Sequence, residues 1–159
     1  MRHSIILNTI RNINNNRIIT GSPKSSNSGI VTIYTFNGSI FVQDTVLVSP
    51  EPESFDQFGS QVVIHGNWVL IANDIHPRKV YKYFYDGTWT YDGTSYDYEP
   101  DDFNPGLAVY NGLVFLGLTL SQTFGAVYYI NEKTSNSSII LGGTDSVILG
   151  QNSIGLGER

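Results

Sequence analysis

Cysteine is absent from this 159-residue sequence, and charged residues are scarce. Without cysteine the chain has no disulfide, no thiolate zinc site and no cysteine nucleophile. Asp, Glu, Lys and Arg make up 14% of the residues, against roughly 25% in an average globular protein. Asn, Ser, Thr, Gly and Tyr must therefore cover much of the surface. This composition is typical of extracellular, virion and fibre proteins.

Basic clusters and long apolar runs are also missing. The nine Lys and Arg residues are scattered along a chain of formal net charge -5, so no basic patch is available to displace counterions from phosphates. No segment reaches the roughly eighteen apolar residues that a membrane-spanning helix needs. The apolar stretch 5–7 is too short for the core of a signal peptide. We therefore expect no nucleic-acid partner and no membrane insertion.

The sequence does contain a repeat, in which a short apolar run ends in a small residue. The three copies of this run are Arg17–Gly21, Trp68–Ala72 and Leu113–Gly117. A second block follows each run at a similar distance, and these blocks begin at Gly29, Arg78 and Gly125, offset by 49 and then 47 positions. A period in the forties with short strands is typical of propeller blades and related arrays, whose units stack on one another to bury their faces.

Nearly all of the chain is predicted to form short β-strands separated by turn residues, because no amphipathic helical pattern of useful length occurs. Apolar and polar residues alternate through 31–36. The pair Asn37-Gly38 that follows is favoured in two-residue hairpin turns. Asp86-Gly87 stands at the corresponding place in the next copy, and Gly66-Asn67 suits a tight turn between two apolar strands.

The copy at 55–72 is the most complete. It carries an aspartate and Phe-Gly before a strand, then a Gly-Asn turn, an apolar strand and a small residue; these are Asp56, Phe58, Gly59, Gly66, Asn67 and Ala72. In the first copy the matching residues are Asn16, Gly21, Ser22, Pro23, Gly29, Val31 and Tyr34. The third copy has a degraded Phe-Gly turn at 102–106 and a good match at Gly125–Tyr128. Over roughly residues 14–131 the chain thus resembles the FG-GAP repeat of integrin-alpha-type β-propellers.

The resemblance implies an all-β fold of about three four-stranded antiparallel propeller-like blades, within residues 1–137. Propellers usually have four to eight blades, so three leave open edges that tend to find partners. We therefore expect the array to be completed by oligomerisation, by neighbouring proteins or by further polypeptide. The calcium loop Asp-x-Asp-x-Asp-Gly that many such repeats carry is missing, and we expect no metal and no cofactor.

A different repeat occupies residues 138–159. Its three near-copies begin at Ser138, Ser146 and Ser153, and each has a small apolar pattern that ends in Leu-Gly. These copies resemble the head repeats of trimeric autotransporter adhesins and similar segments of viral fibres. The alternative is a last pair of propeller strands followed by a glycine-rich exit.

The segment 81–98 is the richest in aromatic residues. Aromatic rings flanked by Asp and Asn suit sugars, whose C–H faces stack on the rings while carboxylates and amides bind the hydroxyls. The candidate glycan-binding residues are Trp89, Tyr91, Asp92, Tyr96 and Asp97. Tyr and Trp are also common in half-buried strands, and a purely structural role for this segment is the alternative.

No motif for nucleophilic, phosphate-loop or paired-carboxylate chemistry occurs, so we expect no catalytic residues. The predicted function is that of a non-enzymatic structural or adhesive module in an extracellular or virion surface assembly. Its partners would be other proteins or further copies of itself, bound by the loops after Gly21, Ala72 and Gly117. One alternative is a lectin that uses the aromatic segment; another is a fragment of a larger polysaccharide-active protein.

Overall fold

The computed structural model describes residues 9–14, 16–75, 78–97, 102–110, 113–120, 124–131 and 136–141. These residues form β-strands joined by turns and loops, and they contain no helix, so the all-β prediction is confirmed. It follows that no helix in this part of the chain is long and apolar enough to cross a bilayer. The chain divides into two compact units, Met1–Tyr98 and Glu99–Arg159.

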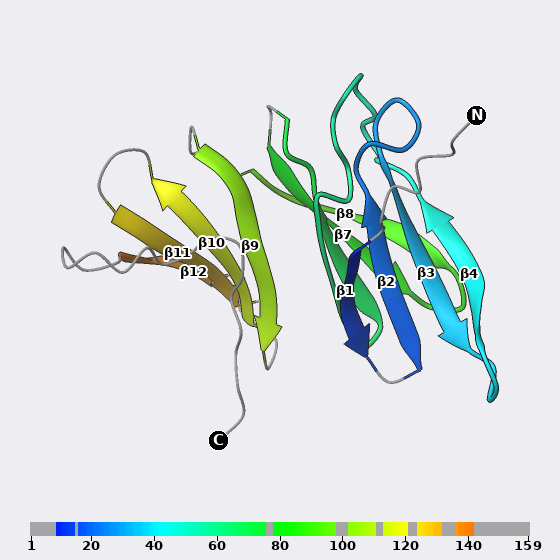
Figure 1. Cartoon of the computed structure of the whole chain (residues 1–159). Helices are drawn as coiled ribbons and strands as arrows, with labels where there is room; N and C mark the ends of the chain where they lie inside the picture. The colour runs from blue at the N-terminus through cyan, green and yellow to red at the C-terminus, as the bar shows by residue number, and fades with distance from the viewer. Residues whose placement is uncertain are drawn as a thin grey trace. The chain divides into compact units, whose positions relative to one another are not determined.

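The described strands form three antiparallel sheets, each made of four strands that are consecutive in the chain (Figure 1). The first unit holds two of them. The first sheet contains β1 (Thr9–Asn14), β2 (Arg17–Ser22), β3 (Ile30–Phe36) and β4 (Phe41–Leu47). The second sheet contains β5 (Gln61–His65), β6 (Trp68–Ala72), β7 (Lys79–Tyr85) and β8 (Trp89–Asp97). The third sheet, in the second unit, contains β9 (Asp102–Tyr110), β10 (Leu113–Leu120), β11 (Phe124–Asn131) and β12 (Asn136–Leu141).

Residues that align in the repeat have the same place in the register of the three sheets. Between the second and third strands of each sheet, the matching backbone pairs are Gly21–Val31, Ala72–Val80 and Gly117–Val127. Because one slipped residue would turn every side chain of a strand to the other face, this agreement also fixes which positions share a face. The repeat seen in the sequence is therefore present in the strand pairing.

The first two strands of each sheet are paired up to equivalent residues. These last pairs are Asn14–Arg17, His65–Trp68 and Tyr110–Leu113. In the second sheet the turn consists of Gly66 and Asn67, and Gly66 has a φ of 58°. Glycine adopts this left-handed conformation without steric cost, so the predicted tight turn is confirmed.

The hairpin turns predicted at Asn37-Gly38 and Asp86-Gly87 differ in detail from the structure. The Asn37 N–H donates to the Ile40 carbonyl (3.0 Å), which leaves Gly38 and Ser39 as the two turn residues. The Asn37 Oδ1 accepts hydrogen bonds from the backbone N–H groups of Ser39 (3.0 Å) and Ile40 (3.1 Å). Asn37 thus caps the turn through its side chain instead of lying inside it. In the second sheet, residues 86–88 separate the paired ends of β7 and β8.

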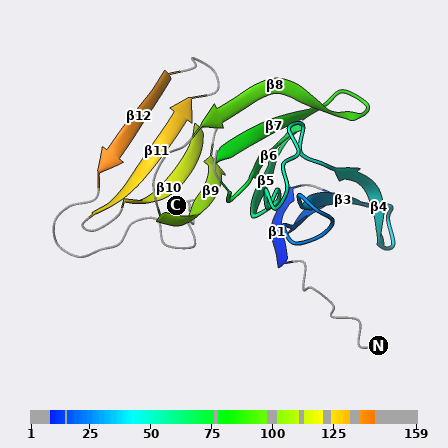
Figure 2. The ribbon, with the colours of Figure 1, turned by 90° about the horizontal axis from the view of Figure 1, so that it is seen from above.

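The main core lies between the first two sheets. Figure 2 shows β4 and β8 apart, whereas β1 lies beside β5. β2 also contacts β5. The buried residues of the first sheet in this core are Ile19, Val31, Ile33 and Leu47. Those of the second sheet are Val62, Ile64, Val69, Ile71, Tyr81 and Tyr83, with Phe58 from the connecting segment and Trp89 and Tyr91 packed against them. The large aromatic side chains lie on β7 and β8, where they fill the wider part of the gap.

Two expectations concern the end of the chain. The loop expected after Gly117 is displaced, because β10 continues to Leu120 and the next residues, 121–123, lie outside the described part. Ser138–Leu141, the start of the first tail repeat, belongs to β12 and pairs with β11. The boundary expected at 137 therefore falls inside a strand, and the other two tail repeats lie outside the described residues.

Candidate interaction sites

The segment 48–60, which connects the first two sheets, is hydrogen-bonded to a loop of each sheet. On one side the Phe55 N–H donates to the Asn27 carbonyl (2.7 Å) and the Phe58 N–H to the Ser28 carbonyl (2.8 Å). On the other side the Gly59 N–H donates to the Ala72 carbonyl (3.0 Å). The Phe-Gly turn therefore joins the loop after β2 to the end of β6. We call residues 23–29, 48–60 and 73–75 the loop end of the first unit.

Glycine is required where these backbones meet. A Cβ placed on Gly21 would lie 2.0 Å from the Gly59 carbonyl oxygen, and one on Gly29 would lie 2.2 Å from the Phe58 carbonyl oxygen. Gly59 itself has a φ of 91°, a conformation that side chains rarely allow. Three glycines of the predicted motif thus permit direct contact between the first sheet and the Phe-Gly turn. Phe58 inserts its fully buried ring into the core beside them.

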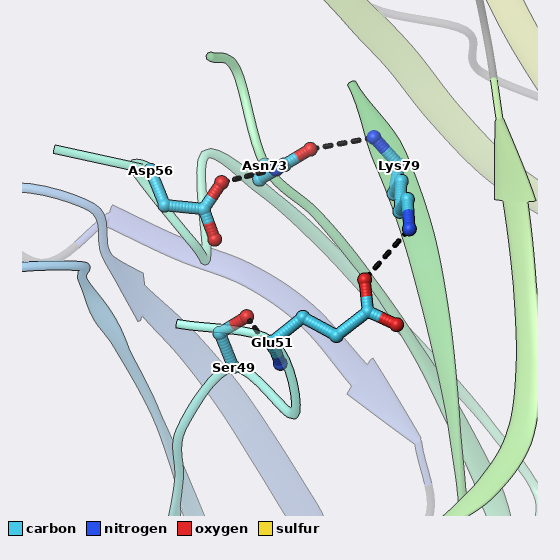
Figure 3. A network of polar contacts seen from close by, with 5 residues as sticks. All are labelled: Ser49, Glu51, Asp56, Asn73 and Lys79. Carbon is cyan, nitrogen blue, oxygen red and sulfur yellow. Dashed lines mark hydrogen bonds and ion pairs between the residues drawn. The ribbon is translucent and has the colours of Figure 1, made fainter. Parts of the chain in front are cut away.

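A network of polar side chains includes Asp56, which precedes the Phe-Gly turn (Figure 3). Asp56 and Asn73 are 4% and 1% exposed, and the Asn73 Nδ2 donates to the Asp56 Oδ1. The Asn73 Oδ1 accepts from the Lys79 backbone N–H (2.6 Å), while the Lys79 Nζ pairs with the Glu51 Oε2 (2.6 Å). The Glu51 N–H donates to the Ser49 Oγ (3.3 Å). The network therefore connects the segment after β4 with β7.

Burial controls the protonation of two groups in this region. Desolvation raises the pKa of the Asp56 carboxyl above its ordinary value of 3.8, although the Asn73 amide and the Ser49 hydroxyl act in the opposite direction. Desolvation likewise raises the pKa of the Tyr83 phenol, whose hydroxyl donates to the Val48 carbonyl (2.5 Å). In the described part of the chain, no three His, Cys, Asp or Glu side chains gather as a metal site would require. These groups have the burial and bonding of a structural network.

The loop end also holds three non-glycine residues in the left-handed region. They are Ser26, Phe55 and Gln57, with φ values of 51°, 67° and 56°. Such conformations are costly and persist only where surrounding contacts impose them. Phe55 is 74% exposed, although the bond from its backbone to Asn27 holds it in place. A large apolar side chain is therefore presented to solvent on a hydrogen-bonded loop, and no signal in the sequence had singled it out.

Two of the predicted glycan-binding residues lie against the core. Trp89 packs against Tyr85, with ring centroids 5.1 Å apart and the ring planes tilted by 47°. Tyr91 lies 6.0 Å from Tyr81 and 5.7 Å from Tyr83, again between ring centroids. Both side chains are partly buried on the face that meets the first sheet. Trp89 and Tyr91 therefore lie on the same face of the sheet, and both pack against tyrosines of β7.

Of the other three predicted residues, the structure describes the side chain of Asp92 alone. Asp92 is a partner of Lys82, with 3.7 Å between its Oδ2 and the Nζ. Tyr96 and Asp97 belong to β8, but their side chains lie outside the described part. Glycan binding at this segment therefore stays a prediction.

A contact between the sheets that the sequence did not indicate involves Arg17, the first residue of β2. Its guanidinium carbon lies 4.1 Å from the centroid of the Tyr85 ring and 5.3 Å from that of Trp89. A cation over an aromatic ring contributes about 0.5–2 kcal/mol, more where water is excluded. The Nε of Arg17 and the Nε1 of Trp89 are buried without a hydrogen bond. Arg17 of the first sheet thus covers the Tyr85–Trp89 pair of the second sheet.

The hairpin formed by β3 and β4, together with Val48 just after it, carries six of the ten exposed large apolar residues in the described part. We define the hairpin patch as Phe36, Ile40, Phe41, Val46 and Val48, all of them exposed. Phe36 pairs with Phe41 in the register, and their ring centroids lie 5.2 Å apart. β4 is also the last strand of its sheet in the described residues. An apolar, uncovered strand at a sheet edge is a typical site of association.

Comparisons of the chain with protein-family models, with curated proteins and with solved structures gave no match. The resemblance to FG-GAP repeats consequently rests on the residues of this chain alone.

Proposed function

We propose that this chain is a non-enzymatic binding module of a structural or adhesive assembly, built from FG-GAP-like blades, with its protein-binding face at the loop end of the first unit. The assembly would belong to an extracellular or virion surface, for which the low content of charged residues is the supporting feature.

The observation that carries the binding face is the presentation of Phe55. An exposed aromatic residue on a loop whose backbone is fixed loses little conformational entropy when it binds a partner. Aromatic residues of this kind supply much of the binding energy at protein interfaces. The Asn27 Nδ2 also donates to the Ser54 Oγ (2.9 Å), which ties the two loops together next to Phe55. These bonds support a preformed contact surface.

Three observations support the blade architecture. The sheets share one register, and the first two approach most closely at their first strands. The Phe-Gly turn also packs on Gly21 of the preceding sheet and on Gly29 in its loop. In a propeller, the first strands of neighbouring blades lie close together near the axis. Glycines at such places permit the backbones to pack closely. The same interpretation explains why the aromatic side chains gather on β7 and β8, where neighbouring blades would diverge.

The test is site-specific photo-cross-linking to extracts of the source organism. A photoreactive residue at Gln57 is expected to capture a partner protein that one at Asn67, in the turn at the other end of β6, does not capture. The captured protein, once purified, should bind the wild-type chain and lose at least about tenfold in affinity with Phe55→Ala, the usual effect of removing an aromatic anchor. Phe84→Ala, which removes another exposed ring, is the control and should bind normally. Equal binding by Phe55→Ala would contradict the proposal.

A further inference from the structure

The Phe36–Phe41 pair in the first sheet has a counterpart in the second sheet. Phe36 faces Phe41 across β3 and β4, and Tyr85 faces Trp89 across β7 and β8. Phe36 and Tyr85 are separated by the repeat offset of 49 residues. The centroid separations are nearly equal, 5.2 Å and 5.1 Å. Both sheets thus carry one aromatic pair at the same place and on the same face.

The two pairs differ in what covers them. The Tyr85–Trp89 pair is covered by Arg17, which begins the second strand of the preceding sheet. The Phe36–Phe41 pair is 40% and 43% exposed, and the described residues include no sheet that precedes β1. Thr32, Tyr34 and Phe36 are alternate residues of β3 and share one face of the sheet. Val46 pairs with Thr32 and therefore lies on the same face as the Phe36–Phe41 pair. The first sheet therefore leaves open the surface that the second sheet uses for packing.

The interface inside the chain indicates what fits this surface. The covering position, Arg17 in the first sheet, corresponds to Trp68 in the second and Leu113 in the third. Trp68 already has the Lys82 Nζ 5.8 Å from its ring centroid. Leu113 is aliphatic and partly exposed, and the described residues include no sheet after β12. A cation suits the phenol and indole of Tyr85 and Trp89, whereas leucine suits two phenylalanines and the uncharged patch around them.

We propose that copies of this chain associate head to tail, with the start of β10 at Leu113 of one copy packed on the hairpin patch of the next. The contact would continue the mode of packing already present between the first two sheets. Because its two halves are different surfaces, it is heterologous and closes into a ring or continues as a filament. The inference rests on the proposed blade repeat and supplies the partner that completes the array.

The first test measures molar mass by light scattering over a range of concentrations. The wild-type chain should exceed 17.6 kDa, the mass of one chain. Phe41→Lys and Leu113→Glu should each reduce the mass of the particle, and Phe84→Lys, a substitution of another exposed ring, should not. A wild-type particle of 17.6 kDa at all concentrations, or a larger one unaffected by either substitution, would overturn the proposal. Circular dichroism and thermal unfolding establish that each variant is folded.

The second test uses the absence of cysteine from the chain. Phe41→Cys and Leu113→Cys proteins are mixed and oxidised, so that any disulfide joins two chains. Head-to-tail packing predicts that the mixture yields more of the cross-linked dimer that contains both variants than each variant yields of a dimer with itself. A cross-link formed mainly by Phe41→Cys with itself would show patch-to-patch pairing and overturn the proposal, as would no cross-link. Failure here leaves the Phe55-dependent binding test unaffected, so the two proposals can fail separately.

Discussion

The backbones of Gly21 and Gly59 are in direct contact, and a Cβ on Gly21 would fall 2.0 Å from the Gly59 carbonyl oxygen. The contact lies where the Phe-Gly turn of one repeat meets the end of β2 in the repeat before it. Two glycines 38 positions apart thus explain why the repeat needs small residues at these places. The contact also carries the packing of the first sheet against the second.

Gly21→Ala should therefore lower the free energy of unfolding by about 2–3 kcal/mol, since the backbone of Gly59 would have to move. Gly66→Ala is the control: Gly66 has a φ of 58°, and no atom lies within 4 Å of the place that its Cβ would take, so the cost should be about 1 kcal/mol. Urea unfolding of both variants measures the difference. An equal effect of the two substitutions would contradict the packing role of Gly21.

Removal of the Asn73 side chain should be more damaging than removal of an exposed amide. Asn73→Ala removes one hydrogen bond from the buried Asp56 carboxylate and one from the Lys79 N–H, at a cost of about 3 kcal/mol. Asn27→Ala, which removes an exposed hydrogen bond to Ser54, should cost less than about 1 kcal/mol. Chemical denaturation at neutral pH compares them. A small effect at Asn73 would show that the network contributes little.

The Asp56 carboxyl makes stability depend on pH in a defined direction. Its pKa in the folded protein lies above the ordinary value, because burial disfavours the charge. The folded state therefore binds more protons than the unfolded state between the two pKa values, and the stability contributed by Asp56 is lost as pH rises through the folded pKa. Asp56→Asn keeps an acceptor for Asn73 and removes this titration.

The expected result is that wild type gains stability relative to Asp56→Asn as the pH is lowered from neutral toward the ordinary carboxyl value of 3.8. Denaturant unfolding at several pH values gives the difference in the free energy of unfolding between the two proteins. The other carboxylates are the same in both proteins, so their contributions cancel in this difference. A difference that stays constant, or that changes with the opposite sign, would refute the buried, desolvated state of Asp56.

Trp89 separates the structural account from the glycan-binding alternative. Because its ring packs on the core and on Tyr85, Trp89→Ala should cost about 3 kcal/mol of stability, more than Phe84→Ala, which removes an exposed ring. On a glycan array the wild-type chain is expected to be silent. Binding by the wild type that disappears in a folded Trp89→Phe variant would instead favour the lectin.

Local sequence signals predicted much of the fold. The repeat aligned Gly21 with Ala72 and Gly117, and the register bears out that alignment because each of these residues faces the valine of the next strand. The Gly66-Asn67 turn followed from a single backbone preference. The turn at Asn37 was shifted because a side-chain amide competes with the backbone for the same N–H groups, and residue type alone does not decide that competition.

Contacts between sheets were not predictable in the same way. Nothing in the sequence near Arg17 indicated that it would cover Tyr85, 68 positions further along the chain. The alternation through β7 and β8 placed Tyr91 and Asp92 on opposite faces, yet the composition of the segment had grouped them into one site. Composition reports which side chains are present, whereas the facing sheet determines which of them are covered.

The central claim is that the chain consists of copies of one β module, and it is tested most directly by cross-strand nuclear Overhauser effects on the isotope-labelled protein. The account predicts contacts between the backbone protons of Gly21 and Val31, of Ala72 and Val80, and of Gly117 and Val127. A different partner for any one of the three, above all for Gly117, would contradict it.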